Sequence, residues 1–417
     1  MNSRKLLCII TSLILLSGFA FGQVTITVPS GLDIELGGEV ELEFVDVEGP
    51  GGFANKDLTF QKVKTRSPHM RIDKAVLATK INYSENLHYT IEFRFDDNGA
   101  KVDKHYADLT VPSLNTRFEL GNNRPFVATK RFTEGYPLVG TAYWKGRELH
   151  VTSESTMELG VLKVNFGLSA AMKRAFDTDD VAEDKSFKMM VYGDYEPKDG
   201  QTWEYGFKAG AEIAGVLAEG WFYTGELMDD YDWKTSLSQS LNGYDALGDE
   251  EDKTHYWYGG RLTGEWGPVH TRGEYIYSKD GLLPREGAYV EVGLRLPENL
   301  TAFMPVQSVS LYGRSGYMNM KDVPLNDGTD YQWAYLAEPM SWSRNMNTLS
   351  AIFKLNENIT VKAEYYILNE DTGGNIKYYT DANHTTLASD GTTTAYSDDS
   401  DTYVKDNQAL VQINFAF

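Results

Sequence analysis

The sequence predicts an all-β fold: a 16-stranded antiparallel transmembrane β-barrel with an inward-folded third external loop. Segments of about ten residues alternate apolar and polar side chains with period two, which is the mark of a strand with two different faces. The connections between these segments alternate between short and long, as the turns and loops of transmembrane barrels do. The chain also ends on an aromatic residue, Phe417, at an apolar-face position.

The N-terminus has the three-part pattern of a secretory signal peptide. Arg4 and Lys5 precede an apolar run, and small residues follow it up to Gly22. We therefore predict a signal peptide over residues 1–22 and a barrel domain over residues 23–417. A retained anchor is the alternative, but the run is shorter than the ~20 residues of a spanning helix. The one cysteine, Cys8, lies in the leader, so the mature chain has no disulfide or thiolate chemistry.

Two hairpins show the alternation most clearly. The first has apolar residues at odd positions over 77–83 and 87–95, and the second over 349–355 and 359–367. Their opposite faces carry polar and charged residues. Further segments with the same pattern cover residues 187–195, 203–213, 256–266, 269–277, 288–296 and 411–417.

Strand parity constrains the count, because a barrel with both ends on one side of the membrane needs an even number of strands. The pattern gives 17 segments if 216–225 is separate from 203–213. We merge these two into one long strand, which gives 16. The weaker segment Asp57 to Val63 is assigned to the first external loop. Every long connection, such as 226–254, 318–346 and 369–403, then lies outside.

The charges of the strands are expected to face the lumen, because Lys or Arg at the bilayer midplane costs ~2–4 kcal/mol. Together with a similar number of acids, the basic residues predicted there include Lys80, Arg94, Lys208, Arg261, Arg272 and Arg295. The formal charge of -21 therefore comes mostly from the loops. Acid clusters at 249–252 and 398–401 offer oxygen ligands to Ca²⁺. They lack a specific spacing, so we favour a solvated loop surface and predict no metal site.

One stretch departs from this acidic background. Residues 122–132 read NNRPFVATKRF, and the region up to residue 147 has a single acid, Glu134, against the basic residues Arg124, Lys130, Arg131, Lys145 and Arg147. These five are the candidate pore constriction and solute-binding residues, with Arg124, Lys130 and Arg131 foremost. The equally weighted alternative is that they pair with lumen carboxylates and fix the loop to the wall. Aromatic residues in the stretch suit a sugar-binding surface, although packing of the loop is the commoner role.

Several motifs in correct order resemble the phosphate-selective porin O/P family of bacterial outer-membrane barrels. They are FELGNNRPF (118–126), GRELHV (146–151), GEWGPVHTRGEY (264–275), GAYVEVGLRL (287–296) and the final LVQINFAF. The resemblance implies a 16-stranded barrel, usually trimeric, whose third external loop narrows the pore. Phe417 resembles the C-terminal signal read by the β-barrel assembly machinery. Two features depart from the family: the lumen charges are mixed in sign, and an aromatic-Glu-x-x-x-Arg pattern is not evident between residues 307 and 319.

The function expected from these patterns is passive diffusion of small hydrophilic solutes, anionic ones among them, across the bacterial outer membrane. Lipid and lipopolysaccharide would surround the barrel, and a homotrimer is expected. A secreted or surface β protein that binds glycans is the alternative. A barrel enzyme is less favoured, because the seven histidines form no local catalytic motif. We expect no cofactor and no nucleic-acid partner.

Overall fold

The computed structural model describes most of the predicted barrel domain. It covers residues 24–28, 32–47, 52–54, 60–62, 68–96, 99–129, 131–135, 138–180, 188–228, 253–281, 283–301, 303–321, 323–324, 330–331, 343–371, 403–405 and 407–417. The predicted signal peptide and the acid clusters at 249–252 and 398–401 lie outside these ranges.

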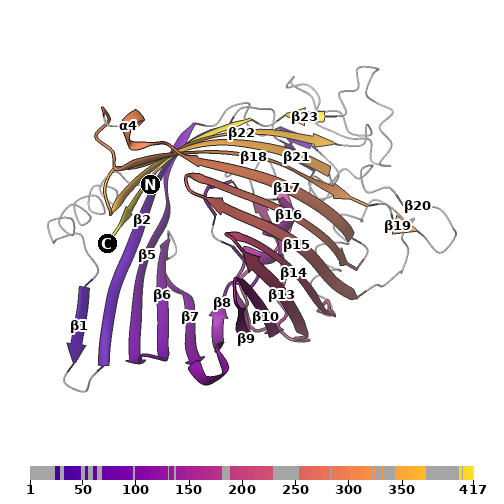
Figure 1. The fold of residues 1–417 in the computed structure, drawn as a ribbon. Coiled ribbons are helices and arrows are strands. Elements are labelled where there is room, and N and C mark those ends of the chain that lie inside the picture. Colours follow the sequence, from indigo (N-terminus) through magenta and orange to yellow (C-terminus); the bar gives the residue numbers. More distant parts are fainter. Residues whose placement is uncertain are drawn as a thin grey trace, which may run out of the picture.

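One antiparallel sheet of 18 strands makes up the body of the molecule (Figure 1). It closes into a barrel because β2 pairs with β5 on one side and with β24 on the other. Two strands, β1 (Val24–Val28) and β23 (Tyr403–Lys405), only extend this sheet beside β2 and β22. The remaining 16 form the wall, which confirms the predicted barrel: β2 (Leu32–Val47), β5 (His69–Ser84), β6 (Leu87–Asp96), β7 (Gly99–Val111), β8 (Thr116–Asn123), β9 (Glu148–Leu159), β10 (Leu162–Met172), β13 (Trp203–Ile213), β14 (Val216–Glu226), β15 (Thr254–Trp266), β16 (Val269–Asp280), β17 (Leu283–Arg295), β18 (Ser308–Met320), β21 (Ser343–Lys354), β22 (Ile359–Asp371) and β24 (Gln408–Ala416).

Short elements lie in the connections. The helical ones are η1 (Pro112–Leu114), α2 (Leu138–Trp144) and α4 (Glu298–Thr301). Three small hairpins pair β3 (Gly52–Ala54) with β4 (Phe60–Lys62), β11 (Phe176–Asp180) with β12 (Lys188–Tyr192), and β19 (Val323–Pro324) with β20 (Asp330–Tyr331). No helix in the described part of the chain combines the length and the apolar character that a membrane crossing requires.

Side chains alternate between the two faces of the wall, as the sequence predicts. On β14 the exposed fraction is 4% for Trp221, 45% for Phe222 and 0% for Tyr223. The outer face is built from exposed apolar residues, whereas the inner face carries most of the charged ones. This division follows from the pleat of a strand, which sends successive side chains to opposite faces.

Two strand assignments made from the sequence are wrong, although the total of 16 is right. Residues 203–213 and 216–225 do not form one long strand: β13 and β14 are antiparallel neighbours joined by the tight turn Ala214-Gly215, where both residues have positive φ. The segment 187–195 is not a wall strand, since β12 pairs only with β11 in a separate hairpin. The two errors compensate in the count.

The connections follow the predicted asymmetry in most places. Those after β2, β8, β10, β14, β18 and β22 are long and lie on one side of the barrel, where the stretch from residue 124 to residue 147 is the third connection. The strand β4 lies in the first, where the segment Asp57 to Val63 was placed. The connections after β6 and β16, on the same side, are short.

Candidate functional site

The described part of the third connection contacts inner-face side chains of strands that lie far apart around the barrel. Lys208 of β13 donates a hydrogen bond to the carbonyl oxygen of Phe126 at 3.1 Å. Arg261 of β15 donates one to the carbonyl oxygen of Val127 at 2.8 Å. Wall cations therefore bind the backbone of the connection, and two of the predicted lumen residues, Lys208 and Arg261, serve as its anchors.

A second group of wall residues holds the connection at Gly135. Arg314 of β18 donates to the Gly135 carbonyl oxygen at 2.6 Å and to the Thr133 hydroxyl at 2.9 Å. The Gly135 amide donates to the hydroxyl of Tyr366 on β22 at 3.0 Å. A side chain at position 135 would collide with the Tyr366 ring, which lies 2.3 Å from the position of an added Cβ. Glycine is thus required for this close approach.

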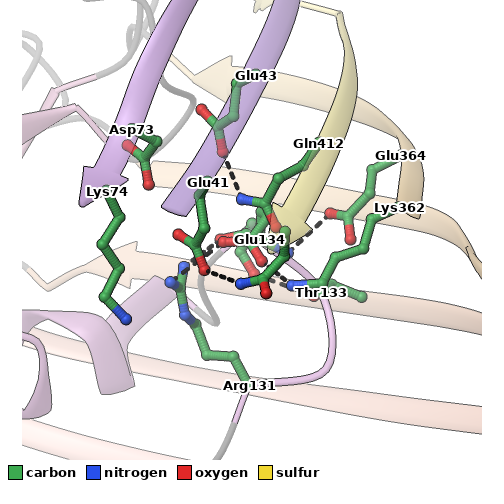
Figure 2. A network of polar contacts seen from close by, with 12 residues as sticks. Glu41, Glu43, Asp73, Lys74, Arg131, Thr133, Glu134, Lys362, Glu364 and Gln412 are labelled. Atoms are coloured by element: carbon green, nitrogen blue, oxygen red, sulfur yellow. Dashed lines mark hydrogen bonds and ion pairs between the residues drawn. The ribbon is translucent and has the colours of Figure 1, made fainter. Parts of the chain in front are cut away.

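Glu134 lies at the centre of a network of charges between the connection and the wall (Figure 2). Its carboxylate pairs with Arg131 at 3.2 Å and with Lys362 of β22. Its backbone amide donates to the carboxylate of Glu364 at 2.9 Å. Burial raises the pKa of Glu134, but the charges of Arg131 and Lys362 outweigh this effect and lower it to about 2. Glu134 is therefore ionised across the physiological range.

The acidic face of β2 lies beside this network. Glu41 and Glu43 point to the same region as Glu134 in Figure 2. Glu43 accepts hydrogen bonds from Arg71 at 3.0 Å and from Gln412 at 2.7 Å, and Glu41 accepts one from Asn414 at 2.9 Å. Amide side chains of β24 thus donate hydrogen bonds to both of these buried carboxylates.

The helix α2 is held by a second network, in which Asp280 of β16 accepts four hydrogen bonds. The donors are the hydroxyls of Tyr143 and Tyr192 at 2.6 Å, the ring nitrogen Nδ1 of His255 at 2.6 Å and the guanidinium of Arg285 at 2.7 Å. All of these residues are almost fully buried.

The same network extends through His255 to the ends of two further strands. The other ring nitrogen of His255 contacts Glu204 of β13, and Lys173 pairs with Glu204 at 3.3 Å. Trp257 stacks on Tyr143 at a centroid distance of 4.5 Å.

The basic residues of the stretch have different surroundings. Arg131 pairs with Glu134, and the buried Arg147 pairs with Asp103 and, at 3.3 Å, with Asp194. Although burial raises the pKa of Asp194, the charge of Arg147 lowers it below its usual range. Arg147 therefore pairs with a carboxylate of the wall, Asp103 of β7, whereas the described carboxylate partner of Arg131 lies in the connection itself.

The remaining candidates divide between the connection and the wall. Arg124 and Lys145 are half-buried, and Lys130 is not among the described residues. Arg94 donates to the Asp73 carbonyl oxygen at 3.1 Å. Arg272 lies over the ring of Phe132 at 5.1 Å, Lys80 lines an inner hollow, and Arg295 is exposed at the end of β17. Phe417 exchanges backbone hydrogen bonds with Gly38 of β2.

Several residues that organise the site were not found from the sequence, notably Arg314, Tyr366, Asp280, His255 and Arg285. Each lies on the inner face of a strand, so the alternation of apolar and polar residues along that strand predicts the face to which its side chain points. Nothing in the sequence indicated which of them would meet the third connection. No group of His, Cys, Asp and Glu in the described part of the chain is arranged to hold a metal ion.

Comparisons with known proteins support the fold. No family model and no curated protein sequence matches the chain. Among solved structures, the outer membrane channel DcaP of Acinetobacter baumannii matches with a TM-score of 0.55 and 14% identity, covering 94% of this chain and 99% of that one. An anion-selective porin from Comamonas acidovorans matches with a TM-score of 0.53 and 10% identity, over 93% and 100%. OmpF of Salmonella typhi, in complex with daunomycin, matches with a TM-score of 0.51 and 12% identity, over 94% and 100%. The chain thus has the fold of outer-membrane porins along almost its whole length.

Proposed function

We propose that the chain is a bacterial outer-membrane porin, a passive diffusion channel for small hydrophilic solutes. The observation that carries this proposal is the closed barrel of 16 strands with an apolar outer face, whose inner-face charges bind the third connection at four separate strands. A connection held in this way narrows the lumen without closing it. The proposal is a channel and not an enzyme, and the matched channels and porins cover the chain end to end.

The setting of this channel follows from the same proposal. Residues 1–22 direct export and are removed, the β-barrel assembly machinery inserts the chain through the signal that ends at Phe417, and lipid and lipopolysaccharide surround the wall. The motifs that resemble the phosphate-selective porin O/P family support a distant relationship to it. Mixed lumen charges, such as the pairs Arg261–Glu274 and Lys208–Glu154, favour a weaker anion preference than phosphate selectivity requires.

The proposal is tested by planar-bilayer conductance with reversal potentials in a KCl gradient. The wild type should give stable single-channel steps and heat-modifiable gel mobility. The variant with Arg124, Lys130 and Arg131 changed to Gln should shift the reversal potential towards cations, because three cations leave the narrowed region. Absence of channels, together with gel mobility unchanged by boiling, would contradict the proposal. Channels with an unchanged reversal potential would contradict only the role of the three residues.

The outer face supports a homotrimer. His105 of β7 and Asn122 of β8 are opposite each other, and their register partners Ile91 and Leu149 put them on the outer face. The atoms Nδ1 of His105 and Oδ1 of Asn122 are buried and have no hydrogen-bond partner among the described residues. Both lie six residues above the turn that joins β7 to β8, about 15 Å along a tilted strand, well inside the ~25 Å apolar band. Polar side chains at this depth are unfavourable against lipid tails, so packing of a second copy of the chain against β7 and β8 is favoured.

The double variant His105→Leu/Asn122→Leu should dissociate the oligomer at a lower temperature than the wild type on unheated gels. Each lost hydrogen bond between copies contributes roughly 1 kcal/mol. Ser315→Leu/Asn347→Leu changes a comparable outward pair on β18 and β21 and serves as the control. Equal dissociation temperatures for all three proteins would show that β7 and β8 face lipid.

A further inference from the structure

A hollow of about 360 Å³ opens in the inner wall near the C-terminal residue of the chain. It lies where four strands present one row of side chains: Glu35 of β2 is opposite Lys80 of β5, Lys80 is opposite Thr90 of β6, and Thr90 is opposite Tyr106 of β7. The next row begins with two small residues, Gly37 and Ala78, which are also opposite each other. The hollow exists because these two positions lack long side chains.

The two charges of the row do not neutralise each other. Lys80 makes no hydrogen bond or ion pair with any residue that the structure describes. Glu35 instead accepts a hydrogen bond from Asn82 at 2.7 Å, and Asn82 contacts the ring of His88 at 2.7 Å. This chain of contacts orients the Glu35 carboxylate and leaves the Lys80 ammonium available at the edge of the hollow.

We propose that the hollow is a binding station for zwitterionic solutes, namely α-amino acids with an apolar or aromatic side chain. The solute carboxylate would bind Lys80, its ammonium group would bind Glu35, and its side chain would lie against Tyr106. This inference rests on the proposed channel function, because the solute reaches the inner wall through the lumen. A volume of about 360 Å³ is at the lower end of the range for ligand pockets, about 300–1,000 Å³, which suits a solute of this size.

Charge complementarity favours zwitterionic solutes over solutes that have a single charge. An organic anion is attracted to Lys80 but repelled by the Glu35 carboxylate. An organic cation is attracted to Glu35 but repelled by the Lys80 ammonium group. A carboxylate has lone pairs for several donors, so Glu35 can accept an ammonium group while it keeps its other contacts, the hydrogen bond from Asn82 among them. Only a solute with both charges forms favourable contacts with both residues.

The test is solute-induced interruption of single-channel current in planar bilayers. We compare L-phenylalanine, which has both charges at pH 7, with 3-phenylpropionate and phenethylamine, which have one each. L-phenylalanine should interrupt the current at the lowest concentration. In Lys80→Gln the required concentration should rise roughly tenfold, because a charge-assisted hydrogen bond is lost. Ala78→Val should weaken the interruption similarly by filling the hollow while leaving every charge in place.

The control is Lys354→Gln, which removes another inner-face lysine at the same end of the barrel and away from the hollow. This variant should respond to L-phenylalanine as the wild type does. Equal potency of 3-phenylpropionate and L-phenylalanine would overturn the assignment to zwitterions, and an undiminished response in Lys80→Gln and Ala78→Val would overturn the site. Either result leaves the ion conductance of the channel intact, whereas loss of all conductance in the wild type would contradict the channel itself.

Discussion

Asp280→Asn is expected to lower the free energy of unfolding of the barrel by about 3–5 kcal/mol, the range for removing one partner of a buried ion pair. The substitution keeps the shape of the side chain but removes its charge and replaces one acceptor oxygen with a donor. Arg285 then remains buried without its partner 2.7 Å away, and two tyrosine hydroxyls compete for one acceptor. The change acts on α2 as well, because Tyr143 is one of the donors.

Equilibrium urea unfolding in lipid vesicles measures this loss through tryptophan fluorescence. Near-UV circular dichroism supplies a local signal, since Trp257 stacks on Tyr143. Asp199→Asn is the matched control: it makes the same chemical change at an exposed position of the connection after β10 and should leave stability unchanged. An Asp280→Asn protein as stable as this control would show that the network does not stabilise the barrel.

The strands of the barrel could be predicted from the sequence because lipid and water impose opposite demands on the two faces of each strand. The sequence contains a pattern from which the separation of β13 and β14 could have been predicted. Outward positions are odd up to Ile213 and even from Val216 onwards, as Phe207 and Phe222 show. A strand keeps its parity except at a β-bulge, and the shift here coincides with a glycine, so it indicates a two-residue turn at Ala214-Gly215.

The hairpin that contains β12 had no such signal. Its alternation is as regular as that of a wall strand, but a strand of five residues is shorter than the 9–11 that a membrane crossing needs. Pairing with β11 is a contact between neighbouring segments, which alternation alone does not distinguish from pairing within the wall.

The contacts of the site were beyond prediction because they join residues far apart in the chain. The Glu134 amide meets the Glu364 carboxylate across 230 positions. Sequence reasoning placed Lys362 and Glu364 on the inner face and Glu134 in the third connection. It supplied no rule for bringing them together. The interpretation that the stretch pairs with wall carboxylates fits the contact of Arg147 with Asp103, whereas the described carboxylate partner of Arg131, Glu134, lies in the connection itself. The role of Arg124 and Lys130 in selecting anions stays a prediction.

Glu134→Gln and Lys362→Met are each expected to release the third connection from β22 and to raise the single-channel conductance. Glu134→Gln leaves both Lys362 and Arg131 without their shared carboxylate, at a cost of about 3–5 kcal/mol. Lys362→Met leaves Glu134 paired with Arg131 alone, so its effect should be in the same direction but smaller. The double variant removes both charges of the Glu134–Lys362 pair but leaves Arg131 without its carboxylate, so its conductance should lie between those of Glu134→Gln and the wild type. Lys354→Met, on the neighbouring strand β21, is the matched control and should conduct as the wild type does.

The pH dependence of the wild type separates this ion pair from other contacts of the connection. The charges of Arg131 and Lys362 overcome the effect of burial and lower the pKa of Glu134 from 4.5 to about 2. A carboxyl group whose pKa is lower in the folded state stabilises the fold fully above its unfolded value and loses that contribution as the pH falls through the folded value. The conductance should therefore stay constant from pH 7 to pH 4.5 and rise as the pH approaches 2, and this rise should be absent in Glu134→Gln. A rise centred near pH 4.5 would show that Glu134 titrates as an unpaired carboxyl group, which would contradict its ion pairs with Arg131 and Lys362.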